Sequence, residues 1–256
     1  MSTVAMLSDR LRTGSPMLSA WCGLPEPAVA GLLARESFDA VTLDMQHGSV
    51  DLAGAVRALP LIAAAGKPGL VRIPVGDYAT ASRLLDAGAS GVIAPMVNSV
   101  EDARRFAAFM KYPPLGERSW GPHGALTLSG LPPAEYFAQA NGTSISFAMV
   151  ETREALAIVD EILATPGVDG IFLGPSDLSI ALSGGAGVNA SSPDVEDALA
   201  HALARARAAG KLAGVYAATG DNAAQRRAQG FHFIAVGSDS MMLRAGAQAA
   251  LKAARA

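Results

Sequence analysis

Five titratable or charged side chains stand at the ends of short apolar runs, where they could do chemistry: Asp44, His47, Arg72, Glu151 and Asp177. The carboxylates of Glu151 and Asp177 could hold a hard divalent cation such as Mg²⁺ or Mn²⁺, with positions left for water and substrate. Such an ion acts as a Lewis acid on a carbonyl group. Arg72 could bind a carboxylate or a developing enolate oxygen. His47 could carry protons, with Asp44 orienting the ring and fixing its tautomer.

Each of these residues also has a purely structural interpretation. A lone acid at the end of a strand is more often a helix cap or a loop anchor, and Asp177 could cap a short helix. Arg72 could pair with a structural acid, and His47 alone is more simply a loop residue. The joint placement of the set at strand ends favours a functional site.

The elements that must position these residues follow from hydrophobic patterning. Apolar, β-branched runs predict strands at 17–22, 40–45, 69–73, 91–96, 145–150, 170–173, 212–216 and 231–236. Segments of helical composition predict helices at 25–35, 50–65, 78–87, 100–110, 153–164, 195–209, 222–228 and 240–253. The predicted helix starts lie near Ser49, Asp77, Ser99 and Pro193.

Eight strand-then-helix units in about 240 residues predict a (β/α)8 TIM barrel, whose active site lies at the carboxyl ends of the strands. The competing fold, a doubly wound open sheet, usually has a glycine-rich turn after its first strand, and residues 21–25 do not form one. No linker divides the chain, so residues 1–256 are expected to form a single domain. Residues 111–144 are predicted to be a long irregular loop, and residues 183–192 a second, mobile one.

Composition excludes several classes of function. Half of the 256 residues are hydrophobic and 17% are charged, which is too apolar for a disordered chain. A net charge of −3 without a basic run argues against nucleic-acid binding. The single cysteine, Cys22, excludes an intrachain disulfide framework. No apolar run is long enough to span a membrane and no signal peptide is evident, so we expect a cytoplasmic protein.

Lysine placement bears on the type of chemistry. None of the four lysines ends a predicted strand, whereas a Schiff-base aldolase needs a lysine within reach of the substrate carbonyl. A carbanion in this protein would therefore be stabilised by a metal, with no organic cofactor. Two carboxylates plus water would accept Mg²⁺, Mn²⁺ or Co²⁺. At the end of the last strand, the Gly237–Ser238 turn could hold a phosphate, and Asp239 could cap the last helix.

Several segments resemble the HpcH/HpaI aldolase family, in the same order and over nearly the whole chain. They are Leu43-Asp44-Met45-Gln46-His47-Gly48, Val71-Arg72, Ala94-Pro95-Met96-Val97, Tyr112-Pro113-Pro114-Leu115-Gly116-Glu117-Arg118, Val150-Glu151 and Gly174-Pro175-Ser176-Asp177-Leu178-Ser179. The resemblance implies a metal-dependent, class II pyruvate aldolase. Such a carbon–carbon lyase makes or cleaves 4-hydroxy-2-oxo acids from a pyruvate or hydroxypyruvate enolate and an aldehyde.

The resemblance also implies roles for the matched residues. Glu151 and Asp177 match the metal ligands, and Arg72 matches the arginine that binds the ketone oxygen of pyruvate. His47 and Asp44 match a dyad that acts on the aldol hydroxyl proton. The backbone of Gly174, Pro175 and Ser176 matches the turn that holds the substrate carboxylate, and Trp21 matches an aromatic residue near the site.

The resemblance further implies a homo-oligomer, a trimer or hexamer, with sites near subunit boundaries and an exchanged C-terminal helix. The acceptor pocket is expected to use the long loop and the end of strand seven, through Arg118, Trp120, His123 and Tyr216. Two residues depart from the family pattern as the heptanedioate aldolases of the family show it: Gln46 stands where those enzymes have Glu, and Met149 where they have Gln. These departures argue against a heptanedioate substrate more than against the reaction type.

Three alternatives to a pyruvate aldolase stay open on the sequence. The first is a malyl-CoA or citrate-lyase-like CoA lyase, although the strand-end loops contain no basic cluster for a nucleotide. The second is an oxaloacetate decarboxylase that uses the same metal and Arg72. The third is a non-catalytic ligand-binding barrel, against which the intact set of site residues argues.

Overall fold

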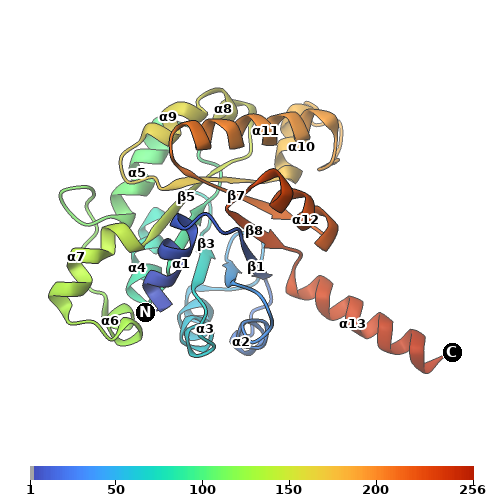
Figure 1. Ribbon diagram of the computed structural model, residues 1–256, viewed down its shortest axis with the longest axis horizontal. Helices are drawn as coiled ribbons and strands as arrows, with labels where there is room; N and C mark the ends of the chain where they lie inside the picture. Colours follow the sequence, from blue (N-terminus) through green and yellow to red (C-terminus); the bar gives the residue numbers. More distant parts are fainter. Residues whose placement is uncertain (1–2) are drawn as a thin grey trace.

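The chain folds into a closed barrel of eight parallel strands that pair in sequence order, with β8 returning to β1 (Figure 1). The computed structural model describes residues 3–256, so the first two residues of the predicted domain 1–256 lie outside it. The strands are β1 (Met17–Cys22), β2 (Ala40–Asp44), β3 (Gly69–Arg72), β4 (Gly91–Ala94), β5 (Ile145–Val150), β6 (Gly170–Leu173), β7 (Leu212–Ala217) and β8 (Phe233–Val236). The predicted (β/α)8 barrel is confirmed.

The helices form the outer layer of the molecule. They are α1 (Thr3–Arg12), α2 (Pro27–Leu33), α3 (Leu52–Ala64), α4 (Tyr78–Asp86), α5 (Val100–Met110), α6 (His123–Ser129), α7 (Pro133–Thr143), α8 (Arg153–Ala157), α9 (Val159–Ala164), α10 (Pro175–Leu182), α11 (Pro193–Ala208), α12 (Gly220–Gln229) and α13 (Asp239–Ala254). Among the described residues, no helix is both long and apolar enough to cross a lipid bilayer.

The strands are buried on both faces, which explains their continuous apolar sequences. Alternate residues point into the barrel, where Phe147, Phe172 and Phe233 pack with ring centroids 5.7–6.5 Å apart. Leu7 and Leu11 of α1 belong to the same interior cluster and are buried. The interior is therefore a packed core rather than a pore.

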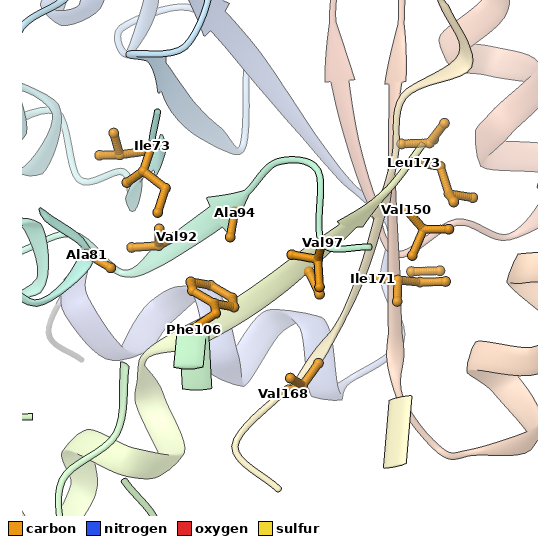
Figure 2. Packing of buried hydrophobic residues seen from close by; sticks show 14 of the residues in the cluster. Ile73, Ala81, Val92, Ala94, Val97, Phe106, Val150, Val168, Ile171 and Leu173 are labelled. Atoms are coloured by element: carbon orange, nitrogen blue, oxygen red, sulfur yellow. The ribbon is translucent and has the colours of Figure 1, made fainter. Parts of the chain in front are cut away.

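A second core lies between the outer faces of the strands and the helices. Figure 2 shows part of it, where Val92 and Ala94 of β4 lie near Phe106 of α5 and Val150 of β5 lies near Ile171 of β6. These residues are fully buried. This packing fixes where each strand ends, and so fixes the side chains that follow those ends.

Three parts of the secondary structure differ from the sequence-based prediction. The stretch 111–144 was expected to be irregular, but it contains α6 and α7. Its Pro and Gly residues mark helix ends: Pro133 begins α7, and Gly130 ends α6 in the left-handed conformation, with φ of 65°. The predicted helix 153–164 is divided at Ile158 into α8 and α9. Helix α1 was not predicted, although Leu7 and Leu11 have helical spacing.

Helix α13 projects away from the barrel instead of packing on it (Figure 1). Its apolar side chains Met241, Leu243 and Leu251 are about half or more exposed. Beside β8 and β1 an open cavity of ≈ 510 Å³ is lined by Leu18, Phe38, Val236 and residues of α12. The outer face of this part of the barrel thus lacks the helix that would follow β8 in a simple barrel.

Candidate active site

The carboxyl ends of the strands surround a cavity of ≈ 380 Å³. Many of the residues singled out from the sequence line it: Trp21, Asp44, His47, Arg72, Gly174, Pro175, Ser176, Asp177 and Tyr216. They come from loops or strand ends of β1, β2, β3, β6 and β7. The closed barrel therefore brings together residues that lie up to 195 positions apart in the sequence, as Trp21 and Tyr216 do.

On the β2–β3 side of the cavity, Asp44 and Arg72 form a buried ion pair. They are direct register partners at the ends of adjacent parallel strands, so both side chains point inward at the same level. Arg72 donates from Nε to Oδ1 of Asp44 at 2.9 Å and from Nη2 to Oδ2 at 2.8 Å. Among the described residues, its third nitrogen, Nη1, has no hydrogen-bond partner. Nη1 is therefore the nitrogen of Arg72 that can donate a hydrogen bond to a ligand.

The carboxylate of Asp44 accepts further hydrogen bonds. Trp21 Nε1 donates to Oδ2 at 3.3 Å, and the backbone N–H groups of Gln46 and His47 donate to Oδ1. Burial by itself would raise the pKa of Asp44, but the hydrogen bonds and charge of Arg72 and the two backbone N–H groups hold it below its usual value. Asp44 is thus kept as a carboxylate whose role is to fix Arg72 and the loop after β2.

His47 lies exposed at the mouth of the cavity. Asp44 was expected to orient its imidazole, but within residues 3–256 the contact between them is the backbone N–H bond of 3.3 Å, with no bond to the ring. The reason is that both oxygens of Asp44 already face Arg72. The loop itself needs glycine at position 48, because a Cβ there would lie 2.3 Å from the carbonyl oxygen of Asp44.

On the β5–β6 side, Glu151 follows β5 directly; it is 1% exposed and lies behind the cavity wall, against Gly174, rather than lining the cavity itself. Met96, at the end of β4, donates its backbone N–H to Glu151 Oε1 at 2.8 Å. Met96 is the one non-glycine residue with positive φ (53°) in the described chain. Backbone conformations of this kind cost free energy and concentrate at functional sites. Here the conformation aims an N–H group at a carboxylate.

The second oxygen of Glu151, Oε2, is buried and has no hydrogen-bond partner among the described residues. Burial, together with the neighbouring Asp177 carboxylate, raises the pKa of Glu151 to about 7, although the Met96 N–H and Arg72 oppose the shift. Two adjacent carboxylates without a cationic side chain between them are poorly compensated. A divalent cation would supply the missing charge, so the two residues fit such an ion.

Glu151 and Asp177 would not be the only ligands of such a cation. Within the described part of the chain, no group of three or more His, Cys, Asp or Glu residues is placed to hold a metal. Two protein carboxylates would therefore leave coordination positions for water and substrate, as is expected where substrate binds the ion directly.

The start of α10 forms the part of the cavity wall next to Glu151. A Cβ on Gly174 would lie 2.7 Å from both Glu151 Oε2 and Met149 Cε, so the backbone approaches the acid because this residue is glycine. No side chain of the described chain caps α10. Its first N–H groups, next to Ser176 and Asp177 on the cavity wall, are thus available to an anionic ligand group.

Three residues expected in the acceptor pocket lie elsewhere. Arg118 is buried in an ion pair with Asp86 at the end of α4, at 2.6 Å, and Trp120 packs on Tyr112. His123 begins α6. This region adjoins the amino-terminal ends of the strands, where Lys111 bonds Ser144 and Asp169 just before β5 and β6.

The expected place of Arg118, Trp120 and His123 is therefore corrected. Helix α5 runs from the carboxyl ends of the strands back to their amino ends, and it carries the segment that follows it to the face opposite the cavity. Of the four residues predicted for the acceptor pocket, Tyr216 lines the cavity of its own chain, with its ring 5.5 Å from that of Trp21.

Sequence reasoning missed two contributions to the site. The backbone of Met96 was not considered as a donor, and nothing in its side chain signals the positive φ. Asp239 was interpreted only as a helix cap, but it also lines the cavity. It stands three residues after the end of β8, among the strand-end residues where the same rule places an active site.

The two departures from the family pattern have different surroundings. Met149 lines the cavity and its methyl group packs against Gly174. Gln46 lies in the loop after β2, where its backbone N–H binds Asp44 and its side-chain oxygen is buried without a partner among the described residues. Met149 therefore faces the space where a ligand would bind.

Comparison with known proteins agrees with this geometry. The model of the family described as HpcH/HpaI aldolase/citrate lyase matches residues 18–245. The chain belongs to this family. The matched range includes every strand after the first residue of β1 and all of the cavity residues described above. The family resemblance noted in the sequence is thereby confirmed.

Curated relatives and solved structures give the same result. The chain is 42% identical to a hydroxypyruvate/pyruvate aldolase of Rhizorhabdus wittichii, covering 95% of this chain and 96% of the relative. It is 35% identical to a 4-hydroxy-2-oxo-heptane-1,7-dioate aldolase of Salmonella dublin, covering 94% and 91%. The crystal structure of a family protein from Burkholderia cenocepacia J2315 is similar, with a TM-score of 0.88, 31% identity and coverage of 98% and 100%.

Proposed function

We propose that this chain is a divalent-cation-dependent aldolase that makes or cleaves 4-hydroxy-2-oxo acids, with pyruvate or hydroxypyruvate as donor and an aldehyde as acceptor. The observation that carries the proposal is the buried Glu151, with its raised pKa and unpartnered Oε2, beside Asp177 and within the same ring of strand ends as Arg72. The names of the relatives from Rhizorhabdus wittichii and Salmonella dublin support the reaction type.

Glu151 and Asp177 would hold the cation, for which Mg²⁺, Mn²⁺ and Co²⁺ are candidates. When bound, the ion would act as a Lewis acid towards the donor's carbonyl group. The chain's own groups bind the rest of the donor. The uncapped start of α10 offers N–H groups to the donor carboxylate.

Arg72 is placed to act on the developing enolate. Its Nε and Nη2 are held by Asp44, so the guanidinium cannot rotate freely. The direction of Nη1 is therefore fixed as well, because the guanidinium is planar and rigid. A fixed donor of this kind stabilises negative charge as it develops, at no cost of reorganisation. Trp21 supports the arrangement, because the guanidinium lies 4.8 Å from the centre of its ring.

His47 is the candidate for moving the proton of the acceptor's hydroxyl group. It lies at the exposed mouth of the cavity, where an imidazole can exchange protons with water. In cleavage the base takes the C4 hydroxyl proton, the C3–C4 bond breaks, and the electron pair passes to the enolate beside Arg72. In synthesis the enolate carbon attacks the aldehyde and His47 returns the proton.

Exchange of pyruvate methyl protons in D₂O, followed by NMR, tests this proposal without requiring the acceptor. Protein stripped with EDTA should exchange slowly, and Mg²⁺ should restore fast exchange. An Arg72→Lys variant should be much slower, because a lysine cannot reproduce the bidentate contact with Asp44. Absence of exchange with Mg²⁺, Mn²⁺ and Co²⁺ in folded protein would contradict the proposal.

We also infer that the protein is a homo-oligomer, a trimer or hexamer, in which α13 is exchanged between subunits. The support is the projecting helix with exposed Met241, Leu243 and Leu251, and the open apolar cavity beside β8 and β1. Light scattering coupled to size exclusion should give a mass of three or six chains. A Leu243→Glu variant should shift it towards smaller species, whereas Glu135→Gln on α7 should not.

A further inference from the structure

The loop between β4 and α5, residues 95–99, is hydrogen-bonded to the end of β5 through its backbone. Met96 donates its N–H to Glu151 Oε1 at 2.8 Å, and Val97 donates its N–H to the backbone oxygen of Met149 at 3.3 Å. Met96 has a φ of 53°, a conformation that costs free energy in a residue with a Cβ. Other contacts of the loop must therefore hold this residue in place.

A pair of side chains provides one such contact, between Asn98 in the loop and Thr152. Thr152 Oγ1 donates to Asn98 Oδ1 at 2.7 Å. The same oxygen accepts the N–H of Ala155 at 3.1 Å and so caps α8. A hydroxyl group has one proton to donate, and here that proton goes to Asn98. The bond joins the residue directly after Glu151 to the loop that carries the Met96 N–H.

Asn98 and Thr152 lie outside the cavity. The described residues that line it include neither of them, and both side chains are partly buried. They act on the site only through the residues to which they are joined. The Met96 N–H holds one oxygen of the Glu151 carboxylate, and the other, Oε2, is left beside Gly174, where a Cβ would lie 2.7 Å from it. The direction of Oε2 thus depends on where the loop places that N–H.

We propose that Asn98 and Thr152 are positioning residues for the cation site. Their hydrogen bond holds the strained loop so that the Met96 N–H fixes the Glu151 carboxylate with Oε2 free for the cation. This inference rests on the proposed function, because it takes Glu151 as a ligand. Removing a group that orients a metal ligand typically costs 10–100-fold in metal affinity or activity. Asn98 acts at one further step, so the lower end of that range is expected.

Binding of Mn²⁺ alone tests the proposal without substrate or turnover. The EPR signal of the free ion falls as the ion binds, which gives the dissociation constant. Asn98→Ala removes the acceptor but leaves Thr152 to cap α8, and the dissociation constant should rise roughly tenfold. Thr152→Val removes the hydroxyl group at constant shape and should have the same effect. Thr152→Ser keeps the hydroxyl group and should bind Mn²⁺ as the unmodified protein does.

Combining the two changes shows whether they remove the same bond. The double variant of Asn98→Ala and Thr152→Val should bind Mn²⁺ no more weakly than Thr152→Val alone, because one interaction can be lost only once. Losses of Mn²⁺ affinity that multiply in the double variant would show that the two residues act separately. That result would overturn the proposed link.

Thr219→Val is the matched control for a lost helix cap. Thr219 lies in the exposed loop after β7, where its Oγ1 accepts the N–H of Asn222 at 3.2 Å and donates to Asn222 Oδ1 at 3.0 Å. The variant therefore loses the same two kinds of bond as Thr152→Val. Both should unfold at lower urea concentration, but only Thr152→Val should bind Mn²⁺ more weakly. An equal loss of Mn²⁺ affinity in Thr219→Val would overturn the positioning role.

Two further measurements separate failure of this inference from failure of the proposed function. If Glu151→Gln left Mn²⁺ affinity unchanged, the cation site itself would be wrong. Weaker binding by Glu151→Gln, with unchanged affinity in folded Asn98→Ala, would overturn only the positioning role. At saturating Mn²⁺, pyruvate proton exchange in Asn98→Ala should stay within about threefold of the unmodified rate, because the bound ion itself holds Glu151. Slow exchange with unchanged Mn²⁺ affinity would also overturn the positioning role.

Discussion

Asp44 and Glu151 are both buried acids at strand ends of one barrel, yet their surroundings act in opposite directions. Asp44, on the β2–β3 side, has Arg72 in bidentate contact, and its pKa is lowered. Glu151, on the β5–β6 side, has one backbone N–H and another acid, and its pKa is raised to about 7. Burial raises both pKa values, so the partners make the difference.

The opposite pKa shifts indicate that the two acids have different roles. Asp44 has its full set of partners within the chain and serves as a fixed support for Arg72. Glu151 has an oxygen without a partner and a charge that the chain does not balance. A buried acid left in this state is destabilising for the fold by itself, which is expected where function requires a partner from outside.

The largest effect should come from removing the charge of Glu151. A Glu151→Gln variant keeps the shape but loses a ligand of the proposed cation site, so pyruvate proton exchange should fall by roughly 10³-fold or more, because a Lewis-acidic ion supplies several kcal/mol. Calorimetric titration should show weaker Mg²⁺ binding. Glu154→Gln, three residues away on exposed α8, is the matched control. Exchange within tenfold of the unmodified protein would show that Glu151 is a structural acid.

The next effect concerns the other side of the cavity. Asp44→Asn leaves Arg72 buried without its counter-charge, so the free energy of unfolding should fall by about 3–5 kcal/mol in urea titrations. Asp160→Asn breaks the exposed pair with Arg205 instead and should change stability little. Similar losses of unfolding free energy for both variants would mean that burial does not increase the contribution of the Asp44–Arg72 pair to stability.

The pH dependence of stability should separate the two acids directly. In EDTA, the folded protein holds a proton on Glu151 that the unfolded chain releases, so the free energy of unfolding should fall by up to about 3 kcal/mol as pH rises from 4.5 to about 7. Asp44 acts in reverse: its contribution is present above pH 3.8 and is lost as pH falls through its lowered pKa.

Two controls accompany this measurement. Glu151→Gln should abolish the fall between pH 4.5 and 7, and saturating Mg²⁺ should also abolish it in the unmodified protein, because the ion favours the charged carboxylate. If Glu151→Gln kept the same slope as the unmodified protein, another group would be responsible for the pH dependence.

The sequence predicted the strands well for a physical reason. Each strand is buried on both faces, so its apolar run is continuous, and the starts predicted for β1, β2, β3, β4, β5, β6 and β7 coincide with those of the structure. Strand ends position the site residues, so Glu151, Asp177 and Arg72 could be grouped from the sequence alone. The bidentate Asp44–Arg72 pair could not, because it depends on the register of β2 and β3.

The secondary structure of the segment after α5 was harder to predict, because its composition is equally typical of loops and of short helices. Pro133 and Gly130 mark helix ends there, and Arg118 is directed to Asp86 by packing of α4, which no local pattern records. Motif residues in that segment therefore gave no information about which face of the barrel they occupy. Only the direction of α5 decides that.

The smallest effect should come from Trp21, at the edge of the Asp44–Arg72 pair. Its Nε1–H bond to Asp44 is long, at 3.3 Å, and Asp44 keeps the donors of Arg72, Gln46 and His47. Trp21→Phe should therefore lower the free energy of unfolding by only about 1–2 kcal/mol. Pyruvate exchange, measured by NMR, should slow by less than tenfold. A loss as large as that of Asp44→Asn would mean that the indole, rather than the register of the strands, holds the pair in place.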